Sequence, residues 1–176
     1  HGVVHVSHRG HHYLAVPNYY CSDTVVMRWE DGRFAELQRI KSDGGGSIEV
    51  FAIGEDQFIG IAEFNVGVAA LYKLSGTHPN ERFVPWDRLA APGVGSMAPM
   101  RVEDAEGAGG EPQLLLIAAS YVTRQTGWRT RSPVFKLNAA GTAFEKVAEV
   151  ATVGAHDVET VTVGGRHVAF VSNDKD

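Results

Sequence analysis

The sequence lacks most of the features that mark disulfide-stabilised, membrane-spanning or nucleic-acid-binding proteins. Cysteine occurs once, as Cys21, so no disulfide can form within the chain. No stretch approaches the 18 or so consecutive apolar residues that predict a transmembrane helix, and we expect no membrane insertion. The formal net charge is −5 and lysine and arginine form no block, which argues against a nucleic-acid partner.

Helical periodicity is also missing, because no window places apolar residues about 3.6 positions apart between helix caps. What the chain has is a repeat of short β-rich runs, each carrying one polar residue near its end. Four such runs align: HYLAVPNY (12–19), QFIGIAEF (57–64), LLLIAASY (114–121) and HVAFVSND (167–174). Internal repetition of this kind is typical of repeat folds.

A second pattern follows the first three runs and keeps the same order in each copy. A cation stands between two large apolar residues, as in a strand with alternating faces, and a phenylalanine follows a turn that contains glycine. The cation-centred triplets are MRW (27–29), YKL (72–74) and FKL (135–137), and the phenylalanines are Phe34, Phe83 and Phe144. We expect the repeat tryptophans Trp29 and Trp86 to lie in the core.

Another β-rich run precedes each copy, at residues 3–8, 47–54, 96–103 and 157–164. Four short strands in about 50 residues are typical of a β-propeller blade, so the predicted fold is all-β, a β-propeller of four-stranded antiparallel blades. About three and a half blades are present. Their expected bounds are about 1–42, 43–92, 93–152 and, for the start of the fourth, 153–176.

This number of blades is too small for a closed ring, since single-chain propellers usually have about four to eight. An open stack would leave an unpaired strand edge and an exposed apolar face. We therefore expect the ring to be completed by the remainder of a longer chain or by a second chain.

The repeat resembles the epilepsy-associated repeat, also called EAR or EPTP. The resemblance rests on YLAVPNY (13–19), VVMRWEDGRFAELQRI (25–40), SIEVFAIGED (47–56) and DVETVTVGGRHVAFVSND (157–174). The third copy departs from the pattern, because SMAPMRVEDAEGAGGEP lacks the expected glutamate and SYVTRQTGWRTRS contains a long insertion.

Members of this family form seven-bladed propellers on secreted or cell-surface proteins, including leucine-rich glioma-inactivated proteins and a large adhesion receptor. The resemblance implies a seven-bladed ring, an extracellular or cell-surface location, and a non-enzymatic role in protein–protein interaction. Folds host many functions, so binding and catalysis must be argued from particular residues.

The insertion in the third copy is the candidate partner-binding segment. Loops on a rigid scaffold carry most recognition, and tryptophan and arginine are enriched at interface hot spots. The expected contact residues are Trp128, Arg124, Arg129 and Arg131. Because these cations stand out on an acidic chain, the expected partner is an acidic protein surface.

Carboxylates on the expected innermost strands are candidate ligands for a channel cation. Glu49, Asp157 and Glu159 would face or rim the channel, and calcium prefers such oxygen ligands. No cofactor is required by the sequence, and calcium in the channel is the candidate. The alternative is a solvated lining or a hydrogen bond between blades.

Five of the eight histidines lie within the first twelve residues, and imidazole suits copper and zinc. His1 and His5 are the candidate ligands here, against the alternative of solvated histidines at strand ends. This group and the channel carboxylates define the alternative function, a metal-dependent propeller enzyme or carbohydrate binder.

Overall fold

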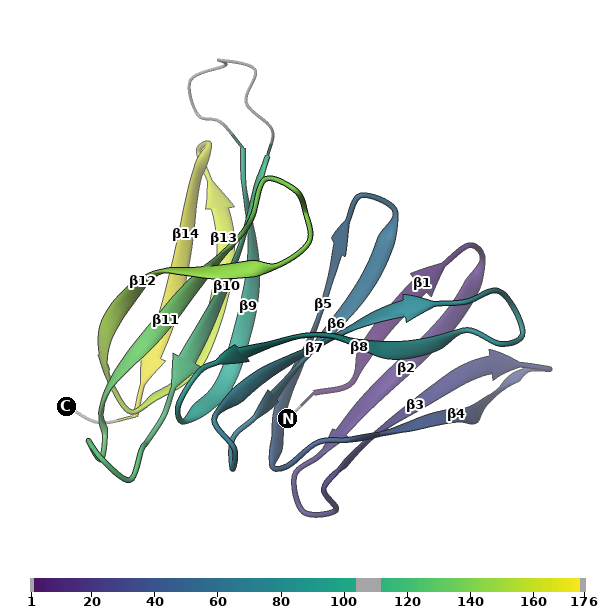
Figure 1. Ribbon diagram of the computed structural model, residues 1–176, viewed down its shortest axis with the longest axis horizontal. Coiled ribbons are helices and arrows are strands. Elements are labelled where there is room, and N and C mark those ends of the chain that lie inside the picture. Colours follow the sequence, from purple (N-terminus) through teal and green to yellow (C-terminus); the bar gives the residue numbers. More distant parts are fainter. Residues whose placement is uncertain (1, 104–111, 175–176) are drawn as a thin grey trace. The chain divides into compact units, whose positions relative to one another are not determined.

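In a computed structural model, residues 2–103 and 112–174 are described, and they form fourteen strands and no helix (Figure 1). Within these ranges there is consequently no helix long and apolar enough to cross a membrane. The short β-rich runs of the sequence thus correspond to strands, and the predicted all-β class is confirmed. Residues 104–111 lie outside the described ranges.

The strands form three four-stranded antiparallel sheets and one two-stranded sheet, and within each sheet consecutive strands of the sequence pair. The first sheet contains β1 (Val4–His8), β2 (His11–Asn18), β3 (Asp23–Glu30) and β4 (Arg33–Lys41). The second contains β5 (Gly45–Ile53), β6 (Asp56–Glu63), β7 (Val68–Ser75) and β8 (Arg82–Ala90). The third contains β9 (Val94–Val102), β10 (Gln113–Ser120), β11 (Arg129–Leu137) and β12 (Phe144–Val153), and the hairpin contains β13 (Ala155–Val163) and β14 (Arg166–Asn173).

Tight turns explain why consecutive runs pair with one another. Between β3 and β4, Asp31 and Gly32 both have left-handed backbone conformations, with φ of 49° and 81°. Two consecutive left-handed residues match the twist of a hairpin, and an Asp-Gly pair adopts this turn readily. The turn brings Glu30 opposite Arg33 and so fixes the register of the two strands.

The chain divides into two compact units, His1–Ala90 and Ala91–Asp176. The first unit holds the first and second sheets. The second unit holds the third sheet and the hairpin β13–β14. Each unit has its own buried core, so each is described by itself.

The core of the first unit lies between its two sheets. The first sheet contributes Val6, Tyr13, Ala15, Val26 and Ile40, and the second contributes Ile48, Ile59, Ile61, Ala70, Tyr72, Leu74 and Phe83. The rings of Tyr13 and Phe83 meet edge to face, with centroids 6.4 Å apart. Aromatic pairs of this geometry stabilise a core by about 0.5–1.5 kcal/mol beyond the effect of burial alone.

The alternation of β3 differs from the expectation drawn from its sequence. Arg28 is buried at 7% exposure, while Trp29 is 46% exposed, so the expected core position of Trp29 is wrong. The arginine points inward because its guanidinium finds acceptors there, as described below. Trp86, by contrast, is partly buried, and its ring packs edge-on against Phe58 at 4.8 Å.

The core of the second unit joins the third sheet to the hairpin. It contains Ala98, Ile117, Ala119, Ala155 and Val158. Three buried hydroxyls on β11 and β12 of the same unit satisfy one another, since Thr130 and Ser132 lie 3.0 and 2.9 Å from Thr152 Oγ1.

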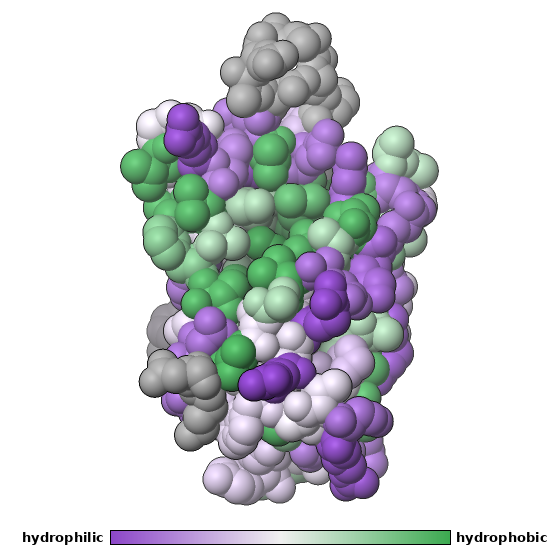
Figure 2. Space-filling view, turned by 90° about the vertical axis from the view of Figure 1, so that its left-hand side faces the viewer, coloured by the Kyte–Doolittle hydropathy of each residue, from purple (hydrophilic) through white to green (hydrophobic). Residues whose placement is uncertain are grey.

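The opposite face of the hairpin β13–β14 carries exposed apolar side chains. Val161, Val163 and Phe170 are 40%, 62% and 61% exposed, whereas Val158, on the inner face, is 2% exposed. The register pairs Glu159 with Phe170, which puts residues 159, 161 and 163 on the same face as Phe170. Figure 2, which faces the left-hand side of Figure 1, shows apolar side chains gathered on the second unit. The outer face of the hairpin is therefore suited to burial under another layer of structure.

Candidate functional site

The candidate partner-binding segment is the connection between β10 and β11, residues 121–128. A small internal turn holds it, because Thr123 and Gly127 exchange two backbone hydrogen bonds of 3.1 and 3.0 Å. Trp128 stands at its end with 39% of its surface exposed, and its ring meets Tyr121 edge-on at 4.8 Å. The tryptophan is thus partly packed and partly available to a partner.

Two neighbouring segments of the second unit support this connection. Gly154, which links β12 to β13, donates its N–H to the Trp128 carbonyl at 2.7 Å. The Tyr121 hydroxyl donates to Asp174 at 3.1 Å, and the Tyr121 ring meets the ring of His156 at 5.3 Å. The exposed ring of Trp128 is therefore held on a fixed backbone, as a binding hot spot requires.

The three arginines of the predicted segment differ in position. Arg124 lies exposed in the connection, but Arg129 and Arg131 belong to strand β11. The expectation that the insertion contains all three arginines is therefore wrong, because the connection ends at Trp128. Both are strand residues because the alternate positions, Thr130 and Ser132, point into the buried hydroxyl cluster. All three arginine side chains nevertheless point to solvent.

Arg131 already has an anionic neighbour, since its Nε donates to Glu149 Oε2 at 2.8 Å. Lys146, which donates to the other oxygen at 2.9 Å, and then Arg131 hold the pKa of Glu149 below its usual value. Among residues 2–103 and 112–174, no ion pair within 4.0 Å involves Arg124 or Arg129. These two cations are the ones best placed to meet an acidic partner.

The corresponding connections of the first unit also carry aromatic residues. Tyr19 and Tyr20 follow β2, and Phe64 follows β6. Tyr20 is 91% exposed, and Tyr19 lies against both Tyr20 and Phe64, at 5.3 and 6.4 Å. An aromatic residue that is at least partly exposed after the second strand is thus a shared feature of the three sheets.

The candidate calcium ligands fall in both units. Glu49 lies on β5, and Asp157 and Glu159 lie on β13. Both strands are the first of their sheets. Asp157 accepts hydrogen bonds from the Ser96 hydroxyl at 2.6 Å and from the Val158 N–H at 3.0 Å. Its carboxylate therefore joins β13 to β9, which is the hydrogen-bonding alternative weighed above. Glu159 is exposed.

Of the candidate histidine ligands, His1 lies outside the described residues. His5 lies on β1, and its Nε2 is 3.0 Å from Nδ1 of His12 on β2, with the two rings stacked at 5.1 Å. These two imidazoles pair across neighbouring strands at exposed positions. Neither His5 nor His12 belongs to the group of potential metal ligands found among the described residues.

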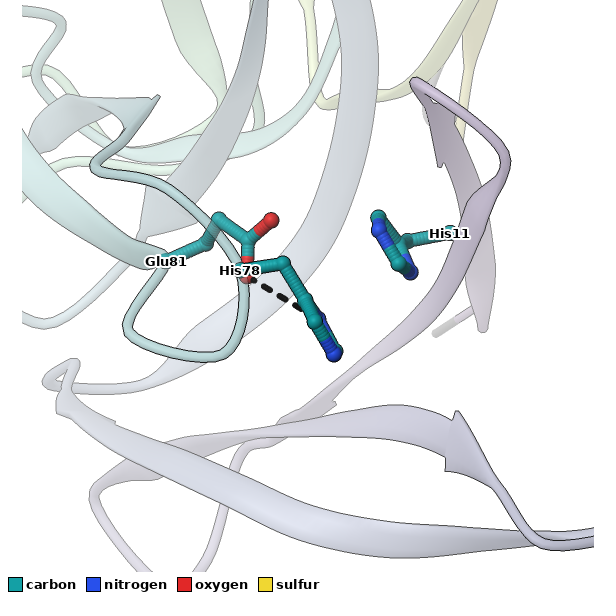
Figure 3. A group of neighbouring side chains, drawn as sticks. All are labelled: His11, His78 and Glu81. Carbon is teal, nitrogen blue, oxygen red and sulfur yellow. Dashed lines mark ion pairs between the residues drawn. The ribbon is translucent and has the colours of Figure 1, made fainter.

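One group of three potential metal ligands does occur in the described part of the chain, and it lies elsewhere in the first unit (Figure 3). His11 begins β2, and His78 and Glu81 come from the connection between β7 and β8. One ligand atom from each residue lies within 4.8 Å of the others. The imidazoles stack in parallel at 4.2 Å, and His78 Nδ1 is 3.6 Å from Glu81 Oε2.

Glu81 is held by a buried cation from the neighbouring sheet. Arg28 Nη1 donates to the Pro79 carbonyl at 2.7 Å and lies 3.4 Å from Glu81 Oε2, while Arg28 Nε donates to Glu30 at 2.6 Å. The side chains of Arg28 and Glu81 are only 8% and 6% exposed. The connection between β7 and β8 is thereby fastened to the first sheet.

The Tyr13 hydroxyl is buried beside this ion pair and makes no hydrogen bond of normal geometry with the described residues. Burial raises the pKa of Tyr13 above its usual 10.0, and the Glu81 carboxylate raises it further, while Arg28 lowers it. The charged form of this phenol is therefore disfavoured in the folded protein.

A pH dependence follows from the raised pKa of Tyr13. Above about pH 10 the unfolded tyrosine loses its proton while the folded one keeps it, so we expect the free energy of unfolding to fall as the pH rises. Between about pH 9 and pH 11, the urea midpoint of unfolding should fall less in Tyr13→Phe than in the parent protein. Equal falls in the two proteins would contradict the assignment.

Sequence reasoning placed His11 in the N-terminal histidine group but missed its partners. His78 and Glu81 lie more than 60 positions away and belong to the next repeat, so no local motif joins them to His11. The one local signal is the spacing of His78 and Glu81, three positions apart in a turn.

Comparisons with known proteins agree with the fold and with the repeat. No model of a protein family matches the chain. Two relatives are the thrombospondin-type laminin G domain and EAR repeat-containing proteins of Mus musculus, 26% identical over 156 residues, and of Homo sapiens, 23% identical over 155 residues. Each alignment covers 85% of this chain, and the chain spans 22% of the length of each relative. The names of both relatives support the resemblance to EAR repeats.

A solved structure with the same type of fold is an exo-beta-1,3-galactanase from Clostridium thermocellum. The TM-score is 0.54 and the identity 11%, and the match covers 96% of this chain and 40% of that one. At this identity the likeness concerns the fold alone. Together with the four-stranded antiparallel sheets, it supports a partial β-propeller as the class of this chain.

Proposed function

We propose that this chain is a non-enzymatic protein–protein interaction module, an EAR-type propeller segment of a larger extracellular or cell-surface assembly. The relatives support this, because their names combine the EAR repeat with a thrombospondin-type laminin G domain. The observation that carries the proposal is the exposed, backbone-supported Trp128 on the connection between β10 and β11.

The proposed binding surface consists of residues 121–128 together with Arg129 and Arg131. Trp128 supplies the large apolar contact, and Arg124 and Arg129 supply positive charge without an ion-pair partner among the described residues. Such a surface fits an acidic protein partner, because charge complementarity steers association while an aromatic anchor supplies most of the affinity.

We expect Trp128→Ala to weaken binding of the partner by about 2 kcal/mol, or roughly 30-fold in the dissociation constant. The matched control is Trp29→Ala. Trp29 has a similar exposure of 46%, and its ring meets Phe34 edge-on at 5.0 Å, much as Trp128 meets Tyr121. A photo-crosslinking residue at the neighbouring exposed position 125, which leaves Trp128 in place, identifies the partner in the native source, and titration then gives the constants for both variants.

Equal affinities of the Trp128 and Trp29 variants for the partner would contradict the assignment of Trp128 to the binding surface. Raising the salt concentration provides a second measurement, since steering by Arg124 and Arg129 should slow association at high ionic strength. An association rate that does not depend on salt would contradict an acidic partner.

The remainder of the propeller is proposed to cover the exposed face of the hairpin β13–β14. Three large apolar side chains lie on that face, and the hairpin has two strands where each of the other sheets has four. The continuing chain of a longer protein, as in the relatives, is the proposed cover, and a second copy of this chain is the alternative.

A further inference from the structure

We propose that His11, His78 and Glu81 form a binding site for a divalent transition-metal ion, with zinc as the ion that fits best, and that the bound ion joins the first two sheets. This site is independent of the proposed partner surface, which lies in the other compact unit. It also differs from the His1 and His5 pair considered from the sequence.

The donor set defines the class of ion. Two imidazole nitrogens and one carboxylate oxygen, with a water in the fourth position, are a recognised ligand set for zinc. Imidazole ligands favour zinc, copper and nickel over calcium and magnesium, which prefer oxygen ligands throughout.

The spacing of the three side chains is close to what a tetrahedral ion requires. With zinc–ligand bonds of about 2.0–2.2 Å, neighbouring ligand atoms stand about 3.3–3.5 Å apart. His78 Nδ1 and Glu81 Oε2 are already 3.6 Å apart, and no ligand atom in the group is more than 4.8 Å from another. His78 is 47% exposed in its side chain, so its ring has room to turn toward the ion.

The surroundings of Glu81 supply a second, independent indication. The Tyr13 hydroxyl is fully buried next to this carboxylate, with which it makes only a poorly aligned hydrogen bond. Carboxylate ligands of metal ions are usually oriented by a hydrogen bond from outside the coordination shell. Donation from the Tyr13 hydroxyl would orient the Glu81 carboxylate in this way.

The charge around the three ligands also suits a cation. Arg28 contributes one positive charge, and Glu30 and Glu81 contribute two negative charges. Arg28 forms its shorter contacts with Glu30, and its contact with Glu81 is the long one at 3.4 Å. Glu81 therefore retains capacity to bind a metal ion without displacing Arg28 from its other partners.

The ion would act as a clip between consecutive repeats. His11 belongs to the first sheet, while His78 and Glu81 belong to the connection between β7 and β8 of the second. Binding to the folded arrangement alone would stabilise the packing of the two sheets, because the three ligands are brought together only when the sheets are in place.

The test is titration of the protein, prepared without a polyhistidine tag, with zinc chloride by isothermal titration calorimetry. We expect one zinc ion per chain and a thermal midpoint that rises with zinc concentration. His11→Ala and His78→Ala should each raise the dissociation constant at least tenfold, and neither residue lies in a strand interior that would unfold on truncation. Glu81→Gln should do the same while keeping the side-chain shape.

The matched control is the double variant His5→Ala, His12→Ala, which removes the other stacked histidine pair of the first unit. Its zinc affinity should equal that of the parent protein. The proposal is overturned if zinc does not bind, or if binding is lost in this control and retained in the three ligand variants. Nuclear magnetic resonance of the imidazole protons gives a readout independent of stability, since the signals of His11 and His78 should shift on zinc addition.

Discussion

Substitution of Gly93 by alanine should destabilise the second unit by about 2–5 kcal/mol. Gly93 has a left-handed φ of 71°, which costs alanine about 1–2 kcal/mol, and a Cβ atom there would overlap the Val122 carbonyl, whose carbon would lie only 3.0 Å away. Relief of such overlap in a packed structure costs about a further 1–3 kcal/mol. Urea unfolding followed by the fluorescence of Trp128 measures the change.

Gly127→Ala is the matched control for this substitution. Gly127 has a similar φ of 60°, but a Cβ atom at that position meets nothing within 4 Å. Only the conformational cost of about 1–2 kcal/mol should remain. Equal losses in the two variants would show that the close approach of Gly93 to Val122 has no energetic weight. Since Gly93 also accepts a hydrogen bond from Tyr121 at 2.7 Å, its substitution should weaken partner binding as well.

Replacement of Arg28 by methionine should lower the free energy of unfolding by about 3–5 kcal/mol, because it leaves the Glu81 carboxylate buried without its cation. The two side chains are 8% and 6% exposed, so solvent screens them little. The Pro79 carbonyl also loses its donor. Denaturant unfolding of the parent and variant proteins gives the difference directly.

Two further variants separate the effect of charge from that of packing. Arg39→Met removes an arginine that is 55% exposed and paired with Glu36 and Asp23, and it should change stability little. The double variant Arg28→Met, Glu81→Gln should recover part of the loss, since it removes the unpaired charge. No recovery would mean that the Arg28 side chain acts through its other contacts.

The repeat made most of the strands predictable, because strand order, turn glycines and phenylalanine positions are encoded locally. Phe34, Phe83 and Phe144 each lie at the start of the fourth strand of a sheet, as the aligned pattern indicates. The hairpin register follows in the same way from short turns such as Asp31-Gly32.

The inward direction of Arg28 could not be predicted in this way. Its acceptors, Pro79 and Glu81, lie 51 and 53 positions along the chain, in the next repeat. A pattern of alternating polarity places the cation outside and Trp29 inside, and only the packing of two sheets reverses this. Similarly, the run RTRS resembles a polar loop, yet Thr130 and Ser132 are buried because Thr152 offers them a hydroxyl partner.

The candidate metal ligands likewise could not be predicted from a local pattern. His11, His78 and Glu81 come from consecutive repeats, and their proximity depends on how the sheets face each other. Trp128 is a candidate contact residue because its insertion departs from an aligned pattern. Departures from a repeat are visible in a sequence, whereas contacts between repeats are not.

The packing of Tyr13 against Phe83 has a consequence for synthesis on the ribosome. Phe83 follows Tyr13 by 70 positions, and chains elongate at about 5–20 residues per second. About 4–14 seconds therefore pass between synthesis of Tyr13 and synthesis of Phe83, which covers the inner face of the first sheet. During that interval Val6, Tyr13 and Val26 are open to solvent and to molecular chaperones. We therefore expect the nascent first repeat to be open to chaperone binding until the second repeat emerges.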